Sequence, residues 1–499
     1  MFFQGADLVY LRWKVRIMKN ILFVASEATP FAKTGGLADV AGSLPKAIDK
    51  EYFDVRVIMP KYGCLKQSEA LEYIGNFQMS FDWREMYVGL FRAVYDGVTY
   101  YFIDDEELFN TQSLYTDDTR FEIRRFAFFS KAALSALQTL NFRPDVIHCH
   151  DWQSGLVPVY LNEMFQDNPF YQGIKTVMTI HNLKFQGRWN LEETQSITGL
   201  PKRCFYSGAL EYYNDANLLK GGLVYSDAIT TVSPSYAEEI QNPFYGEGLD
   251  GLLRLRRNDL RGILNGIDTD VFDPANDPYI PYAFNAGNFR KEKIRNKTAL
   301  QEELGLPVDK KAMMIGIVSR LTDQKGFDLI ARVMEEILAN DNVQFVILGT
   351  GETRYEDMFR YFDYQYHDKF SAHITYSEEL SHKIYAASDA FLMPSLFEPC
   401  GLSQMMSLRY GTLPIVRETG GLRDSVQPYN EYTKEGTGFS FANYNAHEMM
   451  ATIRYAEKIY YDNKRDWNKI VDRAMAADFS WKASALKYQE MYDWLTNGQ

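Results

Sequence analysis

The chain lacks any long uninterrupted apolar stretch. No run of about 18 uncharged apolar residues occurs among its 499 residues, which disfavours a membrane-spanning helix. The first residues, MFFQGADLVYLRWKVRI, lack the order of a secretory signal, so we expect a cytoplasmic protein without a membrane partner. We also expect residues 1–17 to be a leader that is disordered or not native, because Met18 directly precedes the first predicted strand.

Cysteine is scarce as well, and acidic residues outnumber basic ones. The four cysteines have no CxxC spacing, which argues against a zinc site or a disulfide framework. The formal net charge of −13 at pH 7 disfavours a nucleic-acid partner, because the phosphate backbone attracts basic surfaces. An anionic ligand therefore needs a local basic pocket.

Two familiar glycine-rich signatures are missing. The sequence contains neither GxxxxGK[ST] nor a complete GxGxxG, and VILGTGE (346–352) carries only the first two glycines of the latter. There is no low-complexity tract and no short-period repeat.

What the chain does have is two series of apolar, β-branched runs separated by helix-like stretches. The first series comprises ILFVAS (21–26), VRVIM (55–59), TYYFID (99–104), DVIHCH (145–150), KTVMTIH (175–181) and DAITTVS (227–233). The second comprises AMMIGIVS (312–319), VQFVILG (343–349), AHITY (372–376), DAFLMP (389–394) and LPIVR (413–417). Near-continuously hydrophobic strands that alternate with helices indicate parallel sheets covered on both faces. We therefore predict an α/β protein with two doubly wound domains.

The polar, proline-bearing stretch NGIDTDVFDPANDPYIP (265–281) lies between the two series and is typical of a linker. We expect an N-terminal domain over 18–262 and a C-terminal domain over 263–480. The remaining segment, 481–499, has aromatic and aliphatic residues at helical spacing. It predicts a helix that either closes the second domain or crosses back to the first.

The loop KTGGLADV (33–40) follows the first apolar run, and in open α/β sheets ligands bind beyond the carboxyl ends of the strands. Glycines let the backbone approach a ligand and leave helix-start amides free for an anion, while lysine adds a point charge. An ordinary tight turn with a solvated lysine fits this motif equally well. Of two further GGL triplets, LKGGLVYSDA (219–228) favours close helix packing, whereas TGGLRDSV (419–426) is comparable to a ligand loop.

Polar side chains end two more predicted strands of the first series, in IHCHDWQSG (147–155) and TIHNLKFQG (179–187). Histidine donates or accepts hydrogen bonds at neutral pH, and a neighbouring aspartate can orient a substrate hydroxyl. A single histidine at such a place is more often a satisfied core residue. Because two clusters of this kind occur, we favour a functional role for Asp151 and His181.

In the second series, VSRLTDQKG (318–326) places Arg320 at a strand end and Lys325 just before a glycine. An arginine fork and a lysine point charge together suit a diphosphate, although a surface basic pair is the plainer alternative.

The loop SLFEPCGLSQ (395–404) follows another strand of the same series. Glu398 can accept hydrogen bonds from sugar hydroxyls, and the backbone amides of 401–403 can bind phosphate at a helix start. A proline-kinked structural turn is the alternative. Cys400 is a poor candidate nucleophile, because no histidine partner can be assigned to it.

Taken together, KTGGLADV, HDWQSG, TIHN, LNGID, SRLTDQKG, EPCGL and TGGLRDSV resemble, in order and spacing from Met18 onward, the bacterial glycogen synthase and plant starch synthase family. The resemblance implies a B-type glycosyltransferase fold with two Rossmann-like domains facing an interdomain cleft. The N-terminal domain would lie on the acceptor side and the C-terminal domain would bind the nucleotide sugar.

The resemblance also implies an enzyme of glycogen biosynthesis. This enzyme would transfer glucose from ADP-glucose to the non-reducing end of an α-1,4-glucan primer, such as glycogen or a maltooligosaccharide, and release ADP with retention at C1. No carboxylate can be singled out as a nucleophile, so the family implies attack on the face that ADP leaves. No metal or other cofactor is expected.

Carried over residue by residue, the resemblance implies two sets of site residues. The catalytic set is Lys33, Asp151, His181, Arg320, Lys325 and Glu398. The substrate-binding set is Gly35, Gly36, Asp39, Asn265, Tyr376, Cys400, Gly401, Leu402 and Ser403, with Tyr376 near adenine. Two positions depart from the family pattern: Gln153 stands where histidine is frequent, and Ser403 where threonine is common.

Three other functions remain open. A glucan phosphorylase would share the architecture but needs a pyridoxal phosphate Schiff base, and no lysine is marked for one. A transferase that uses UDP-glucose differs only in base recognition, which the sequence does not reveal. A noncatalytic glucan-binding protein could lose the charged residues of the site, and their presence argues for an enzyme.

Overall fold

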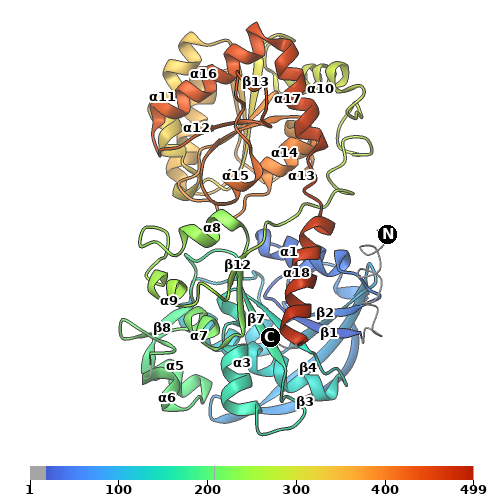
Figure 1. Ribbon diagram of the computed structural model, residues 1–499, viewed down its shortest axis with the longest axis vertical. Coiled ribbons are helices and arrows are strands. Elements are labelled where there is room, and N and C mark those ends of the chain that lie inside the picture. Colours follow the sequence, from blue (N-terminus) through green and yellow to red (C-terminus); the bar gives the residue numbers. More distant parts are fainter. Residues whose placement is uncertain (1–17, 207, 498–499) are drawn as a thin grey trace, which may run out of the picture. The chain divides into compact units, whose positions relative to one another are not determined.

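The computed structural model describes residues 18–206 and 208–497, which form two compact units (Figure 1). Unit 1 contains the described residues up to Thr230, the segment Arg256–Leu260 and the described residues from Ala485 onward. Unit 2 contains Thr231–Leu255 and Arg261–Ser484. The expected leader, residues 1–17, lies outside the described residues.

The compact units divide the chain differently from the expected boundary near residue 262. Residues 231–255 group with unit 2, because α8 (Pro234–Glu239) is bonded to α15 (Gly420–Ser425). The Asp424 carboxylate accepts the N–H and the hydroxyl of Ser235, each at 2.7 Å. Partners this far apart in the chain leave no local sequence signal. The C-terminal helix α18 (Trp481–Thr496) groups with unit 1 from Ala485 onward, one of the two alternatives expected for it.

A nine-stranded sheet in the order β12-β11-β7-β6-β1-β2-β5-β4-β3 belongs to unit 1, except for residues 231 and 261–262, which end β11 and β12 and group with unit 2. All six predicted strands are present, as β1 (Lys19–Val24), β2 (Phe53–Pro60), β5 (Val98–Asp104), β6 (Val146–His150), β7 (Lys175–Ile180) and β11 (Ala228–Thr231). The run β7-β6-β1-β2-β5 is parallel throughout. The carboxyl ends of β1, β6 and β7 therefore lie side by side at one edge of the sheet.

Three strands of this sheet were not predicted: β3 (Glu72–Phe81), β4 (Arg84–Tyr95) and β12 (Leu260–Gly262). The first two pair antiparallel, and β4 also pairs antiparallel with β5, so the sheet is mixed rather than purely parallel. Many side chains of β3 and β4 are exposed, which breaks the continuous hydrophobic pattern used for the prediction. A small second sheet joins β8 (Arg188–Asn190), β10 (Asp215–Asn217) and β9 (Glu211–Tyr212).

Unit 2 contains a six-stranded parallel sheet in the order β15-β14-β13-β16-β17-β18. The five predicted strands are present and β18 was not predicted; the strands are β13 (Met313–Val318), β14 (Val343–Leu348), β15 (Phe370–His373), β16 (Ala390–Met393), β17 (Leu413–Arg417) and β18 (Phe439–Phe441).

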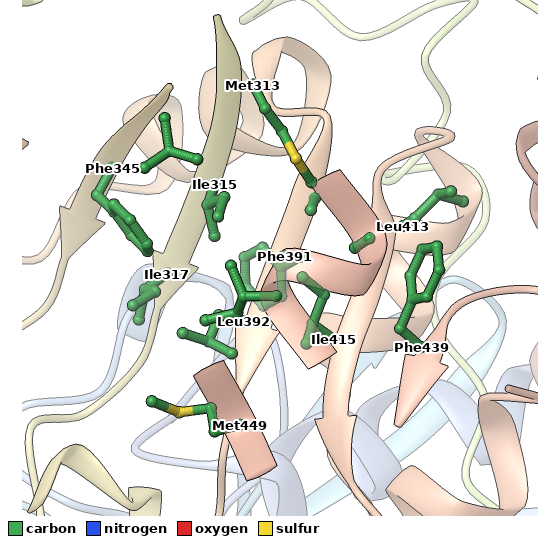
Figure 2. Close-up of a cluster of buried hydrophobic side chains, with 14 of the residues drawn as sticks. Met313, Ile315, Ile317, Phe345, Phe391, Leu392, Leu413, Ile415, Phe439 and Met449 are labelled. Atoms are coloured by element: carbon green, nitrogen blue, oxygen red, sulfur yellow. The ribbon is translucent and has the colours of Figure 1, made fainter. Parts of the chain in front are cut away.

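Helices cover both faces of this second sheet, as predicted. Along β13, Ile315 and Ile317 belong to the large buried cluster shown in Figure 2, which Ile330 of α11 (Phe327–Asn340) joins. Met314 points to the opposite face, where it packs with Leu300 of α10 (Phe289–Leu304) and Ile384 of α13 (Glu378–Ala387). Successive side chains of a strand alternate between faces, so each face has its own apolar layer.

The helices follow the strands in the alternation that the sequence predicts. In unit 1 they are α1 (Gly36–Ala47), α2 (Glu106–Phe109), α3 (Thr119–Thr139), α4 (Leu156–Tyr160), α5 (Leu191–Thr198), α6 (Lys202–Tyr206) and α7 (Leu218–Tyr225). In unit 2, besides α8 and α15, they are α9 (Asp250–Leu255), α10 (Phe289–Leu304), α11 (Phe327–Asn340), α12 (Thr353–Gln365), α13 (Glu378–Ala387), α14 (Ser403–Arg409), α16 (Ala446–Asp462) and α17 (Lys464–Ala476). None of the helices in the described part of the chain combines the length and apolarity needed to cross a bilayer.

Candidate active site

The loop KTGGLADV lies beyond the end of β1, as predicted, and α1 begins inside it at Gly36. The ammonium of Lys33 lies 2.7 Å from the Asp39 carboxylate in the first turn of α1. A Cβ placed on Gly35 would meet no atom within 4 Å. Packing within the described chain therefore gives no reason for a glycine at this position.

Glu27 is a residue of this loop region that the sequence analysis missed. Its side chain is buried just beyond β1, and its carboxylate accepts the N–H of Thr34 at 2.5 Å and the Thr34 hydroxyl at 3.0 and 3.1 Å. Burial raises the pKa of Glu27 to about 7, against the lowering effect of the Thr34 hydrogen bonds. The sequence does contain one indication of its role: Glu27 directly follows an apolar run, as do the candidate residues at the other strand ends.

Asp151 and His181 follow the neighbouring strands β6 and β7, and the structure brings them together. The Asp151 carboxylate accepts the backbone N–H of His181 at 2.7 Å. Burial raises the pKa of Asp151 to about 7, although the N–H bonds from His181 and Asn182 lower it. Burial lowers the pKa of His181 to about 3, so this imidazole is neutral at physiological pH.

The two other histidines of this region are core residues. His148 is fully buried, and its ring nitrogens hydrogen-bond the Tyr492 hydroxyl at 2.7 Å and the Thr179 hydroxyl at 2.5 Å. His150 stacks on His148 with ring centroids 4.3 Å apart, and its Nδ1 lies 3.0 Å from Nε2 of His181. This hydrogen bond ties the partly exposed His181 to the buried core.

Gln153 and Asn265 are buried side chains with unused hydrogen-bonding capacity. Gln153 is 7% exposed and Asn265 is 4% exposed. Within residues 18–206 and 208–497, neither side-chain carbonyl oxygen has a hydrogen-bond partner. Leaving such an acceptor unpaired is costly, which makes both oxygens candidate ligand contacts.

In unit 2, Lys325 and Glu398 form a partly buried ion pair. The Lys325 Nζ lies 2.7 Å from Oε2 of Glu398, and their side chains are 16% and 7% exposed. The Ser395 hydroxyl donates to the same oxygen at 3.0 Å. Arg320, beyond the end of β13, is exposed, and its guanidinium has no ion pair with any residue that the structure describes.

The loops that carry Lys325 and Glu398 are held together by backbone contacts. The N–H of Leu396 donates to the Gln324 carbonyl at 2.9 Å. Gly326 has φ +75°, and a Cβ there would lie 2.0 Å from the Pro394 carbonyl oxygen. Only glycine allows this close approach, so the position of Lys325 is fixed by packing.

The EPCGL segment leads into α14, which begins at Ser403, so the amides of 401–403 lie at a helix start as predicted. Gly401 has φ +69°, a conformation that favours glycine. Cys400 is 5% exposed, and burial raises the pKa of its thiol to about 12. This thiol is therefore protonated at neutral pH, consistent with its rejection as a nucleophile.

The other two GGL triplets are explained by packing. A Cβ on Gly222 in α7 would lie 3.0 Å from both the Gly155 carbonyl and the Met178 sulfur, which confirms the close helix packing expected there. In TGGLRDSV, a Cβ on Gly420 would lie 2.0 Å from the Glu398 carbonyl. The Gly420 N–H donates to Glu239 at 2.8 Å, so a ligand is not needed to explain this glycine.

Many candidate residues in each unit follow the carboxyl ends of parallel strands and therefore lie along one edge of the sheet. In unit 2, Arg320, Glu398 and Tyr376 follow β13, β16 and β15, and Tyr376 is 81% exposed. Within the described ranges, 18–206 and 208–497, no group of three or more His, Cys, Asp or Glu side chains is placed to hold a metal ion.

Two family models match the chain. The model of the starch synthase catalytic domain matches residues 20–255, and that of the group 1 glycosyl transferases matches residues 297–471. A protein of Lachnospira eligens named glycogen synthase is 63% identical over 478 residues, which is 95% of this chain and 100% of the relative. The chain belongs to the glycogen synthase family. A glycogen synthase of Lachnoclostridium phytofermentans is 61% identical with the same coverage.

Solved structures confirm the predicted fold class. The catalytic domain of starch synthase IV from Arabidopsis thaliana, bound to ADP and acarbose, aligns with a TM-score of 0.89 and 33% identity, covering 97% of this chain and 100% of that domain. Sucrose-phosphate synthase from Thermosynechococcus elongatus aligns with a TM-score of 0.58 at 16% identity and shares the fold alone. The chain has the B-type glycosyltransferase fold and is a hexosyltransferase, as predicted.

Proposed function

We propose that the chain transfers glucose from ADP-glucose to the non-reducing end of an α-1,4-glucan, releasing ADP with retention at C1. The observation that carries the proposal is 63% identity over the full length of a relative named glycogen synthase. The starch synthase IV structure, solved with ADP and acarbose, supports a nucleoside diphosphate donor.

Departure of ADP builds negative charge on the phosphate and positive charge on the glucose ring. Groups that are already aimed at the growing charge lower the barrier, because their interaction strengthens toward the transition state. Arg320, Lys325 and Lys33 supply cations for this role. The amides at 35–36 and 401–403 supply hydrogen-bond donors at two helix starts.

The ion pair gives Lys325 and Glu398 complementary roles in this proposal. Glu398 holds the ammonium of Lys325 in one position through the 2.7 Å contact. Its remaining acceptor capacity suits the hydroxyls of the transferred glucose. Cys400 contributes through its backbone, because its thiol is buried and protonated.

Retention of configuration here does not require a carboxylate nucleophile. Asp151, the carboxylate in the catalytic set of unit 1, accepts the His181 N–H and thereby orients that segment. As the family resemblance implies, we assign attack to the face that ADP leaves, with the departing phosphate accepting the proton of the incoming hydroxyl. Three cations and no metal or other cofactor serve the leaving group.

The remaining candidates orient the two substrates. His181 is neutral, and because its Nε2 bonds to His150, its Nδ1 is the ring nitrogen that suits a sugar hydroxyl. Asp39 and Asn265 suit other hydroxyls of the glucose or acceptor, and the exposed ring of Tyr376 suits stacking on adenine. Gln153 suits the acceptor.

Product analysis tests this proposal. The protein is incubated with ADP-glucose labelled in its glucose and with a maltooligosaccharide, and the new linkage is identified by proton NMR. We expect an α-1,4 linkage whose label is removed by an enzyme that digests from the non-reducing end. A β linkage, or label at the reducing end, would contradict the proposal. Binding of the oligosaccharide without transfer would favour a noncatalytic glucan-binding protein.

A further inference from the structure

The loop that carries Lys33 is fastened to the core of unit 1 by one buried side chain. Glu27 is 3% exposed, and its carboxylate accepts both donors of Thr34, the residue between Lys33 and Gly35. Thr34 itself is exposed, so this contact joins a surface loop to a buried anchor. A carboxylate that accepts an N–H and an O–H from one residue fixes both its position and its orientation.

We propose that Glu27 is a positioning residue of the transferase, which holds residues 33–36 in the conformation that presents Lys33 and the helix-start amides to the donor diphosphate. This inference rests on the proposed function. Glu27 does not touch the substrate in this account; it acts through Thr34. A cation lowers the activation barrier most when it is already positioned at the site of the developing negative charge. Movement of the loop that carries Lys33 would therefore raise the barrier.

The anchoring is a specific arrangement, and packing alone does not explain it. Burial of Glu27 opposes its ionisation, and the nearby negative charge of Asp39 opposes it further. A neutral apolar side chain at this position would avoid both costs. A buried ionisable side chain that carries such an energetic cost beside a candidate site is typically retained for function rather than for stability.

The chain contains a matched control for this contact. Glu122, also buried in unit 1, accepts the N–H of Thr116 at 3.1 Å and its hydroxyl at 2.8 Å. Thr116 lies outside the sets assigned to catalysis and binding. Thr34→Val and Thr116→Val thus each delete one hydroxyl that donates to a buried glutamate, and Thr34→Ser keeps the hydroxyl.

The test measures initial rates of ADP release with each substrate varied in turn. For Thr34→Val and Glu27→Gln, we expect kcat/KM for ADP-glucose to fall about tenfold or more, the equivalent of one charge-assisted hydrogen bond, with KM for glycogen unchanged. Thr116→Val and Thr34→Ser should keep the wild-type kcat/KM. Equal losses in Thr34→Val and Thr116→Val, or a rise in KM for glycogen, would overturn the proposal.

Hydrogen exchange provides a second readout that does not depend on activity. The peptide covering residues 28–37 should exchange faster in Glu27→Gln than in the wild type, with peptides of β2 and β5 unchanged. Wild-type exchange in that peptide would overturn the inference even if the transferase activity stands. If the wild-type protein releases no ADP, the proposed function fails, and the exchange result alone decides whether Glu27 anchors the loop.

The pH profile distinguishes Glu27 from its surroundings. The titratable groups facing it are Asp39 of α1, Asp151 beyond β6, and the hydroxyls of Tyr62 and Tyr115. Deprotonation of Glu27 strengthens the bonds to Thr34, so kcat/KM for ADP-glucose should rise with an inflection near pH 7 in the wild type. That inflection should weaken in Glu27→Gln; an unchanged profile would contradict the proposed role.

Discussion

Lys325 Nζ lies 2.7 Å from Glu398 Oε2, and this contact joins the loops that follow two neighbouring parallel strands, β13 and β16. Both side chains are largely buried, so each charge depends on the other for compensation. The same pair thus stabilises unit 2 and, in the proposed mechanism, supplies the Lys325 cation that neutralises charge on the leaving phosphate.

Separating these two roles is possible with paired substitutions. Lys325→Met leaves Glu398 buried without its partner, so we expect the free energy of unfolding to fall by about 3–5 kcal/mol. The double variant Lys325→Met with Glu398→Gln should recover most of that loss, because no uncompensated charge remains. Turnover should stay at least about 100-fold below wild type in both variants. Urea unfolding and ADP release measure the two quantities; recovery of turnover together with stability would show that the pair is only structural.

Arg320 offers a cleaner case, because its exposed guanidinium has no ion pair with the described residues. Arg320→Ala should change the free energy of unfolding by no more than about 0.5 kcal/mol. The loss of a leaving-group cation should lower kcat by about 100-fold to 1,000-fold. The control is Arg360→Ala, which removes an exposed arginine of α12 that is 52% exposed and pairs with Glu356. Near-normal turnover of Arg320→Ala would refute the assigned role.

Substitution by alanine should leave the stability of the fold unchanged at Gly35 and lower it at Gly326. A Cβ on Gly35 meets no atom within 4 Å, and its φ of −159° suits any residue, so Gly35→Ala should fold normally. In Gly326→Ala the added Cβ would lie 2.0 Å from the Pro394 carbonyl oxygen at φ +75°, so the melting temperature should fall. If Gly35 admits the donor, Gly35→Ala raises KM for ADP-glucose. Wild-type KM would assign Gly35 to an ordinary turn.

The buried carboxyl of Asp151 predicts a pH dependence of stability. Its pKa rises from 3.8 to about 7 on folding, so the folded chain holds this proton more tightly than the unfolded chain. Its contribution to stability is therefore present at pH 4 and is lost as the pH rises through 7. Asp151→Asn keeps an acceptor for the His181 N–H but does not ionise.

Relative to wild type, the free energy of unfolding of Asp151→Asn should increase by up to about 4 kcal/mol between pH 4 and pH 8. Urea unfolding of both proteins at several pH values measures this difference, with Glu27 present in both. A difference that does not vary with pH would contradict the raised pKa of Asp151.

The sequence predicted the parts of the fold that depend on local pattern. Each of the eleven predicted strands is present, because strands buried on both faces carry continuous apolar runs. The strands β3 and β4 were not predicted, because half-exposed antiparallel strands lack continuous apolar runs. The grouping of residues 231–255 with unit 2 depends on contacts such as Ser235 to Asp424, which span 189 positions.

The candidate site was predicted in the same uneven way. Residues at strand ends, such as Asp151 and His181, could be found because the topology places those ends at one sheet edge. The pairing of Lys325 with Glu398 could not be predicted from the sequence, because 73 positions separate the two residues and no local pattern links their loops. Glu27 was overlooked because a lone glutamate after a strand looks like an ordinary polar residue until its burial is known.

Nucleotide release distinguishes glucosyl transfer from ADP-glucose from the other functions considered for this chain. The protein is supplied with ADP-glucose or, separately, with UDP-glucose, each with and without glycogen, and the free nucleoside diphosphate is quantified. We predict ADP release that depends on glycogen, with little UDP release under the same conditions. Preferred release of UDP would contradict the donor assignment, and absence of release from both donors, with glycogen still bound, would contradict glucosyl transfer itself.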